Sequence, residues 1–345
     1  MHSDDIYIVK NRDVVELLSG HESEVVAAVA EAYRTHAAQK SSLPHSLFLR
    51  FPDGPKNRII ALPAYLGGHF EVAGMKWVAS FPDNITKGLE RASAVVVLNS
   101  PETGRPYALI EGSSISAKRT AASAALAAQT LQNGRGTTAA SLLGCGLINF
   151  EIARFLLNTY PGIERFTLYD VDPARAEQFK ERCRQTFEGV EVEVAPDVET
   201  ALGRAPVISL ATTAVTPHIS DLSACVPDAT VLHVSLRDLT PEAILSCDNV
   251  VDDIDHVCRA QTSVHLAEQL SGVRDFIRCT LADVLTGAAA PRRGDGSVAV
   301  FSPFGLGVLD LALAKLVYEH AVERGVGEVI ASFLPESWGG EGRVA

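Results

Sequence analysis

The sequence predicts an α/β protein that combines a doubly wound parallel sheet with a discontinuous α+β domain. Three observations lead to this fold class. Residues 46–112 hold short β-rich runs separated by Pro, Gly and Asn. After residue 136, apolar runs of strand length alternate with helical patterns, as they do in βαβ units. One of these strand-to-helix junctions carries the sequence Gly-x-Gly.

The N-terminal part is predicted to place two helices around an antiparallel sheet. Residues 22–39 repeat apolar side chains at helical spacing. Residues 113–134 form a long pattern of small residues that ends at Asn133-Gly134. The β-rich runs between these helices are typical of meanders.

The remainder of the chain predicts a parallel sheet followed by a returning helix. Its strand-length runs are TAASLLG, RFTLYDVD, VEVEVAP, PVISLATTA, TVLHVSL, NVVDDI and SVAVFSP. A helix over residues 305–325 is expected to return to the first domain. We therefore predict a substrate-binding domain of residues 1–125 and 306–345 around a nucleotide-binding domain of residues 126–305. The tail, residues 336–345, is expected to be mobile.

Composition narrows the class of protein. The 345 residues are 47% hydrophobic and 21% charged, as in ordinary globular proteins, and suffice for about two domains. A net charge of −12 argues against nucleic-acid binding and against docking on anionic membranes. We expect neither a signal peptide nor a membrane span, because the first residues are polar and the apolar runs are short. The six cysteines form no C-x-x-C pair, which favours reduced thiols and a cytoplasmic location.

The Gly-x-Gly junction has the features of a dinucleotide-binding turn. Gly144 would form the tight turn, and Gly146 would let a pyrophosphate approach the backbone at the N-terminus of the next helix. Asp170 ends the following strand, 24 residues after Gly146 (170 − 146), close to the ~20 expected for an acid that binds ribose. Since no Arg directly follows Asp170, NAD is favoured over NADP. Asn149 stands where a third glycine is usual, and the alternative is an ordinary strand–turn–helix with an incidental Asp.

Several cations of the first domain are possible ligands for an acidic substrate. They are Arg58, Lys76, Arg91 and the adjacent pair Lys118-Arg119. Arg58 and Lys76 lie in apolar strand patterns, where an unpaired charge would be costly. Either these side chains point outward, or they line a pocket for anions.

Asp238 is the predicted acid–base group, because it follows a strand whose carboxyl end faces the ligand crevice of a parallel sheet. The alternative is that Asp238 caps the next helix, a role that Thr240 could also fill. Residues 250–256 contain three Asp and one His, but without a second cluster no metal site is predicted. No role is assigned to His69, His218, His233 or His265.

Together with the motifs given below, these residues make the chain resemble the ornithine cyclodeaminase/μ-crystallin family over nearly its whole length. Within the family it is most similar to the branch of N-(2-amino-2-carboxyethyl)-L-glutamate dehydrogenases, which form 2,3-diaminopropionate for siderophores and peptide antibiotics. The motifs that carry the resemblance are RIIALPAYLGG, AGMKWVASFPDN, ERASAVVVLNSPETGRPYALIEGSSISAKRTAA, LLGCGLINFEIARF, LYDVDPARA, VVDDIDHVCR and PFGLGVLDLALA.

The resemblance implies a homodimer with a Rossmann domain that binds NAD. It implies that Arg58, Lys76 and Arg119 hold substrate carboxylates and that Asp238, together with Lys76, serves catalysis. We add Arg91, because this branch's substrate has three carboxylates. The cofactor-binding residues are then expected to be Thr120, Gly144, Cys145, Gly146, Leu147, Ile148, Asp170, Thr212 and Ser235.

The resemblance also implies a reaction. NAD takes hydride from the glutamate α-carbon of a secondary amine, and Asp238 accepts the amine proton and then activates water to hydrolyse the imine. A pyridoxal-phosphate-dependent synthase would supply the substrate. Asn149 departs from this branch, which has glycine there. Pro303 and the missing lysine after Asp238 depart from other members, and together these departures count more against an ornithine cyclodeaminase. The alternatives left open are that enzyme, a ketimine reductase and a non-catalytic binder.

Overall fold

A computed structural model describes residues 4–335 of the chain. The chain forms two compact units: Met1–His21, Ala38–Ser116 and Gly307–Ala345 make the first, and Glu22–Ala37 with Ala117–Leu306 make the second. Within residues 4–335, no helix is long and apolar enough to cross a membrane. The predicted mobility of residues 336–345 lies outside the described residues.

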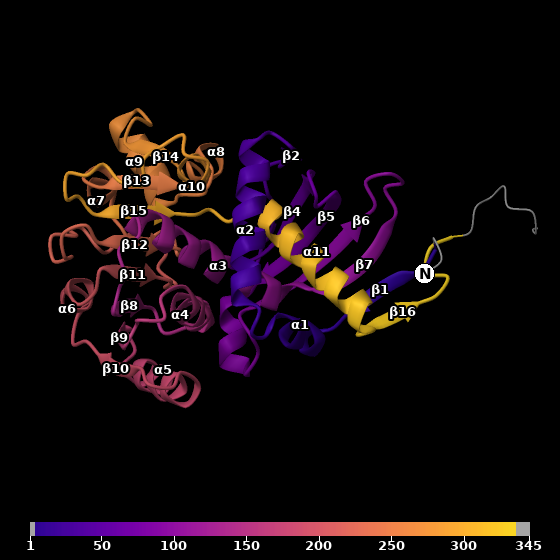
Figure 1. Cartoon of the computed structure of the whole chain (residues 1–345), viewed down its shortest axis with the longest axis horizontal. Coiled ribbons are helices and arrows are strands. Elements are labelled where there is room, and N and C mark those ends of the chain that lie inside the picture. Colours follow the sequence, from indigo (N-terminus) through magenta and orange to yellow (C-terminus); the bar gives the residue numbers. More distant parts are fainter. Residues whose placement is uncertain (1–3, 336–345) are drawn as a thin grey trace, which may run out of the picture. The chain divides into compact units, whose positions relative to one another are not determined.

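The first unit is built on an eight-stranded mixed sheet (Figure 1). Its order is β16-β1-β7-β6-β5-β4-β2, and β3 pairs with β4. The neighbours β4 to β7 are antiparallel, which confirms the predicted meander. The strands are β1 (Ile6–Val9), β2 (Ser41–Ser42), β3 (Leu47–Phe51), β4 (Gly54–Leu66), β5 (Val72–Ser80), β6 (Ala92–Asn99), β7 (Pro106–Glu111) and β16 (Glu328–Ile330).

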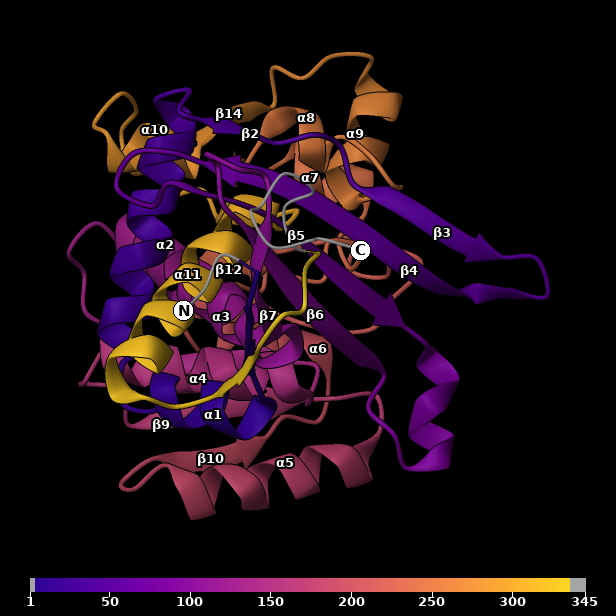
Figure 2. The same cartoon turned by 90° about the vertical axis from the view of Figure 1, so that its right-hand side faces the viewer.

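The faces of this sheet differ because α11 (Gly307–Arg324) packs on only one of them. Gly74 allows the close approach, since a Cβ there would lie 3.1 Å from Leu311 Cδ2 and 2.2 Å from the Val97 carbonyl oxygen. Lys76 shares this face with Gly74. On the opposite face the register aligns Leu47, Ala61 and Trp77 across β3, β4 and β5, which Figure 2 shows as long neighbouring strands. The unit also contains α1 (Asn11–Leu18) and a 3₁₀ turn, η1 (Pro82–Lys87).

The second unit holds an eight-stranded sheet in which all neighbouring strands are parallel, as predicted. Its order is β10-β9-β8-β11-β12-β15-β13-β14. Successive strands are added on one side of β8 as far as β10 and then on its other side from β11 on, so the strand order reverses between β8 and β11. The strands are β8 (Ala139–Leu143), β9 (Arg165–Tyr169), β10 (Glu191–Val194), β11 (Val207–Leu210), β12 (Thr230–His233), β13 (Asp248–Val251), β14 (Ile277–Thr280) and β15 (Ala299–Ser302).

Helices cover both faces of this parallel sheet, with α6 and α7 on the face opposite α3 and α4 (Figure 1). The alternation of strand and helix thus gives the doubly wound arrangement that the sequence predicts. The helices are α2 (Glu22–Ala37), α3 (Gly112–Gln132), α4 (Leu147–Thr159), α5 (Pro173–Thr186), α6 (Val198–Gly203), α7 (Pro241–Leu245), α8 (Ile254–Val257), α9 (Ser263–Ser271) and α10 (Leu281–Leu285).

The two compact units differ from the predicted domains in two places. Residues 22–37 and 117–125 were assigned to the first domain, but both belong to the second unit. The reason is packing that sequence periodicity does not reveal: α2 buries Val25, Val29 and Tyr33, and the Tyr33 hydroxyl lies 2.7 Å from that of Ser123 on α3. The strands β1, β2, β14 and β16 were not predicted.

Candidate functional site

The Gly-x-Gly turn lies at the end of β8, where it begins α4. Gly144 has φ of +93°, and a Cβ at this position would lie 2.5 Å from the carbonyl oxygen of Ala211. Only glycine fits such a conformation beside another strand. Gly146 precedes α4 in extended conformation, and a Cβ there would meet nothing within 4 Å. The turn therefore leaves open space over the N-terminus of α4.

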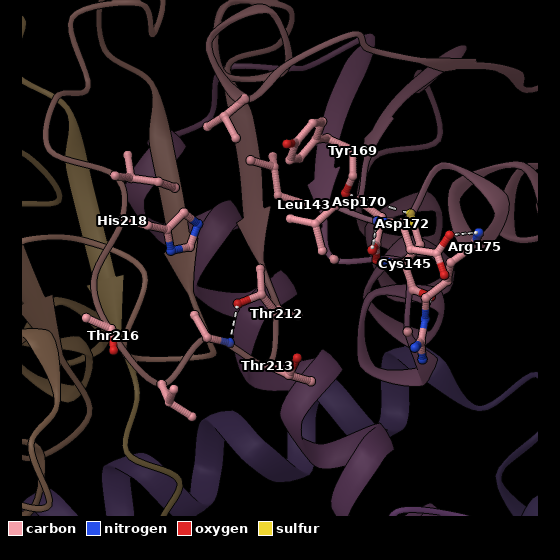
Figure 3. A pocket seen from close by; sticks show the side chains of 18 residues that line it. Leu143, Cys145, Tyr169, Asp170, Asp172, Arg175, Thr212, Thr213, Thr216 and His218 are labelled. Atoms are coloured by element: carbon pink, nitrogen blue, oxygen red, sulfur yellow. Dashed lines mark hydrogen bonds between the residues drawn. The ribbon is translucent and has the colours of Figure 1, made fainter. Parts of the chain in front are cut away.

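A cavity of about 500 Å³ opens beside this turn (Figure 3). It lies at the carboxyl ends of β8, β9 and β11, and so includes the point where the strand order reverses, as ligand crevices of parallel sheets do. Its described lining includes Gly144, Cys145, Gly146, Asp170 and Thr212 of the predicted residues, but not Thr120, Leu147, Ile148 or Ser235.

Asp170 holds a defined position at the cavity wall. One carboxylate oxygen accepts a hydrogen bond from the backbone N–H of Cys145 at 2.7 Å, and the other accepts from the N–H of Asp172 at 3.0 Å. Arg175, in the first turn of α5, donates from Nε to the Cys145 carbonyl at 3.1 Å and also lines the cavity (Figure 3). Arg175 was not predicted, because it lies five positions beyond Asp170 and not directly after it.

Asn149 replaces the third glycine without opening a gap between helix and sheet. Its buried side chain donates to the carbonyl oxygens of Leu143 and Gly144, each at 2.8 Å, and accepts from the Ser209 hydroxyl at 2.7 Å. The amide therefore joins α4 to the end of β8 and to β11. The side chain that was expected to add bulk at this position is therefore buried and hydrogen-bonded between the helix and the sheet.

Asp238 is fully buried beside the ends of β11 and β12. Its carboxylate accepts hydrogen bonds from the hydroxyls of Thr212 and Ser235. His233 Nε2 lies 3.2 Å from the Asp238 backbone nitrogen and 3.5 Å from the carboxylate. Burial raises the pKa of Asp238, but His233 and the two hydroxyls lower it by more than burial raises it. The net pKa therefore lies below the ordinary value. These hydrogen-bond donors thus favour the carboxylate form of Asp238.

The alternative role for Asp238, as a helix cap, is wrong. Thr240 caps α7 by accepting a hydrogen bond from the N–H of Ala243. The backbone carbonyl of Asp238 instead accepts from the N–H groups of His218 and Ile219, which ties the acid to the cavity wall. Leu236, two residues earlier, has φ of +67°, a strained value of the kind that clusters at functional sites.

The predicted cations are divided between the two units. In the first unit, Lys76 is buried with its ammonium 2.7 Å from the Asp310 carboxylate and 3.1 Å from the Ser116 hydroxyl. Arg58 lies in β4 and Arg91 immediately before β6, and burial lowers the pKa of Arg91. In the second unit, Arg119 is buried on α3 against Gly305, where a Cβ would lie 2.9 Å from its Nη1.

The acidic cluster of residues 250–256 serves the local fold. Asp252 accepts hydrogen bonds from the N–H groups of Phe304 and Gly305, at 2.8 and 2.7 Å. Asp253 caps α8 by accepting from the N–H of His256, and it also lies 3.4 Å from His36 of α2. These contacts give the acidic side chains structural partners at the end of β13 and the start of α8.

Comparison with known proteins places this arrangement in a family. Residues 7–325 match the model of the ornithine cyclodeaminase/mu-crystallin family. The chain belongs to this family. It is 29% identical to N-((2S)-2-amino-2-carboxyethyl)-L-glutamate dehydrogenase of Staphylococcus aureus, over 96% of this chain and 99% of that one. It is 30% identical to alanine dehydrogenase of Archaeoglobus fulgidus, over 94% and 98%.

Solved structures of family members share the fold of the whole chain. Δ(1)-pyrroline-2-carboxylate reductase of Thermococcus litoralis, solved with NADH and L-proline, superposes with a TM-score of 0.87 at 26% identity, covering 94% of this chain and 99% of that one. An archaeal alanine dehydrogenase dimer with bound NAD gives 0.84 at 28% identity, covering 94% and 99%.

Sequence reasoning missed three polar residues of the second unit that the structure places at or beside the cavity. His233 contacts Asp238, His218 lines the cavity, and Arg175 lines it too while donating to the Cys145 carbonyl. The position of His233 at the end of a predicted strand was the available signal, because strand ends meet at the same edge of the sheet.

Proposed function

We propose that this family member is an NAD-dependent dehydrogenase that converts N-(2-amino-2-carboxyethyl)-L-glutamate to 2,3-diaminopropionate and 2-oxoglutarate. The observation that carries the proposal is the buried Asp238 carboxylate, which accepts hydrogen bonds from Ser235 and from Thr212 of the glycine-turn cavity at the carboxyl ends of the parallel strands. The substrate is supported by the likeness to the Staphylococcus aureus enzyme over nearly the full length of both chains.

The described residues fit a dinucleotide. The open space over Gly146 and the N–H groups that begin α4 suit a pyrophosphate, and the Asp170 carboxylate suits a ribose hydroxyl. When bound, NAD would supply the acceptor for hydride. The negative charge of Asp170 would disfavour a 2′-phosphate, which is why we propose NAD and not NADP.

In the proposed reaction the chain's own residues orient carboxylates and move protons. Arg58, Lys76, Arg91 and Arg119 would neutralise the substrate's carboxylates and fix the glutamate α-carbon. Asp238 would take the proton of the secondary amine as hydride leaves and return it to the imine nitrogen. It would then take a proton from the water that attacks the imine carbon and pass it to the departing amine of 2,3-diaminopropionate. The hydroxyls of Thr212 and Ser235 hold this carboxylate in one orientation, so its free lone pairs have a fixed direction.

We also propose a homodimer formed through the open face of the first unit's sheet. Leu47 is 71% and Trp77 36% exposed on the face opposite α11, and Leu49 is exposed on the same strand as Leu47. Such an apolar face is expected to be covered by a partner, and the archaeal alanine dehydrogenase relative was solved as a dimer. Light scattering on Leu47→Glu and on the wild type would test it: a wild-type monomer contradicts the proposal.

The decisive assay mixes the protein with NAD and N-(2-amino-2-carboxyethyl)-L-glutamate and follows NADH together with 2-oxoglutarate. L-Ornithine, L-alanine and L-proline are assayed in parallel, since the family is named for ornithine cyclodeaminase and relatives at similar identity are an alanine dehydrogenase and a Δ(1)-pyrroline-2-carboxylate reductase. Stoichiometric NADH and 2-oxoglutarate support the proposal. Turnover of only one of the other amino acids would transfer the protein to that activity, and binding of NADH without any turnover would favour a binder. A synthase that joins phosphoserine to glutamate would be the upstream partner.

A further inference from the structure

The hydrogen-bond partners of the Asn149 side-chain amide determine which way its NH₂ group and its oxygen point. Both acceptors of Nδ2 are backbone carbonyls, those of Leu143 and Gly144, and the Oδ1 atom accepts from the Ser209 hydroxyl. Because carbonyl oxygens can only accept, the NH₂ group must face the glycine turn. Asn149 has no exposed surface, so water cannot replace these bonds.

These bonds act on a single peptide group from its two ends. The carbonyl of Gly144 and the N–H of Cys145 belong to one planar peptide and point in opposite directions. Asn149 holds the carbonyl end at 2.8 Å, and Asp170 accepts from the N–H end at 2.7 Å. A peptide that follows a glycine would otherwise rotate easily, since glycine restricts φ and ψ least.

We propose that Asn149 is a positioning residue for the ribose-binding carboxylate, acting through the Gly144–Cys145 peptide. Asn149 fixes this peptide, and the Cys145 N–H then fixes the oxygen of Asp170 that it contacts. The opposite oxygen is held by the N–H of Asp172. The inference rests on the proposed binding of NAD. It means that Asn149 is a working substitute for the third glycine of the motif and not a defect in it.

For Asn149→Gly, this proposal and the three-glycine motif predict opposite effects on NADH binding. Asn149→Gly restores Gly-x-Gly-x-x-Gly and should improve binding if the third glycine is what the site needs. If Asn149 positions Asp170, this variant loses the donor to Gly144 and should bind NADH about tenfold more weakly. Asn149→Ala should behave in the same way, since it also lacks the amide.

Asn249 offers a matched control within the same unit. It is also buried, and its Nδ2 likewise donates to backbone carbonyls, those of Ile244, Cys247 and Phe276. These contacts lie at β13, away from the cavity lining. Asn249→Ala should therefore lower the unfolding temperature much as Asn149→Ala does, while its Kd for NADH stays at the wild-type value.

Three measurements on the full-length protein test the proposal: the Kd for NADH, the ratio of Kd values for NADPH and NADH, and hydrogen exchange of the segment 143–150 without nucleotide. For both Asn149 variants we expect weaker NADH binding, a smaller preference for NADH and faster exchange. Wild-type exchange and affinity in Asn149→Gly, or an equal loss of affinity in Asn249→Ala, would overturn it. If the wild type fails to bind NADH, the proposed function falls, and the exchange comparison still decides whether Asn149 holds the turn.

Discussion

The ammonium of Lys76 lies 2.7 Å from the carboxylate of Asp310, and both side chains are buried within the first unit. Lys76 belongs to β5 and Asp310 to α11, so the ion pair joins the helix to the face of the sheet that it covers. Lys76 is predicted to hold substrate, and its charge is thus already balanced by Asp310, which lies far along the chain.

Removing one partner of this pair should be costly. Asp310→Leu leaves the Lys76 charge buried, and we expect the free energy of unfolding to fall by about 3–5 kcal/mol. The double variant Lys76→Met/Asp310→Leu should recover most of that stability, as measured by urea unfolding. If Lys76 also holds substrate, the double variant remains inactive although it is stable, and recovery of activity would remove Lys76 from the site.

Asp238→Asn should separate chemistry from nucleotide binding. The amide cannot accept a proton from the amine or from water, so kcat on the proposed substrate is expected to fall about a hundredfold to ten-thousandfold. The Kd for NADH should change little. Thr240→Ala is the control, since it removes only the cap of α7 and should cost about 1 kcal/mol while activity persists. Near wild-type turnover in Asp238→Asn would exclude the carboxylate from the mechanism.

Asp170→Ala should weaken NADH binding about tenfold or more, because a charged hydrogen bond to the ribose and the anchor of the Cys145 N–H are both lost. Binding of NADPH should weaken less, since the repulsion of its 2′-phosphate disappears. Asp197→Ala is a suitable control: Asp197 caps α6 by accepting from Thr200 and is not among the residues that line the cavity. Unchanged NADH affinity in Asp170→Ala would refute the ribose contact.

Gly144→Ala should be far more damaging than Gly134→Ala. Both glycines have positive φ, so an alanine is strained at either position. At Gly134 a Cβ would meet nothing within 4 Å, whereas at Gly144 it would lie 2.5 Å from the Ala211 carbonyl oxygen. We expect the difference in unfolding free energy between the two variants to be about 1–3 kcal/mol, the usual cost of overpacking. Equal stability would mean that β11 moves away without penalty.

His256 should make stability depend on pH. Its hydrogen bond with Asp253 raises the pKa of His256 above the ordinary value, against the opposing effect of burial; Asp252 adds to the rise and Arg259 counters it. A raised folded-state pKa means that the contribution is complete below the unfolded-state pKa of about 6.5 and is lost as pH rises through the folded-state value. Urea unfolding of wild type should therefore lose stability above that pH relative to His256→Gln. Parallel profiles for the two proteins would contradict this.

Local patterns were sufficient for much of the fold. The strand–glycine–helix junction at Gly144, the acid at the end of β9 and the alternation of strands and helices depend on backbone propensity and periodicity, which neighbouring residues determine. The parallel sheet, the meander and the three long helices are therefore where the sequence placed them. The same local information located Asp238 at the end of a strand.

The partners of the functional side chains were decided only by tertiary structure. Asp238 meets Thr212 because the parallel neighbours β11 and β12 bring their carboxyl ends to the same edge, and Lys76 meets Asp310 because α11 returns to the first sheet. The assignment of α2 to the second unit is of the same kind. Burial, hydrogen-bond satisfaction and charge balance are properties of contacts between distant segments, and the order of residues along the chain does not specify them by itself.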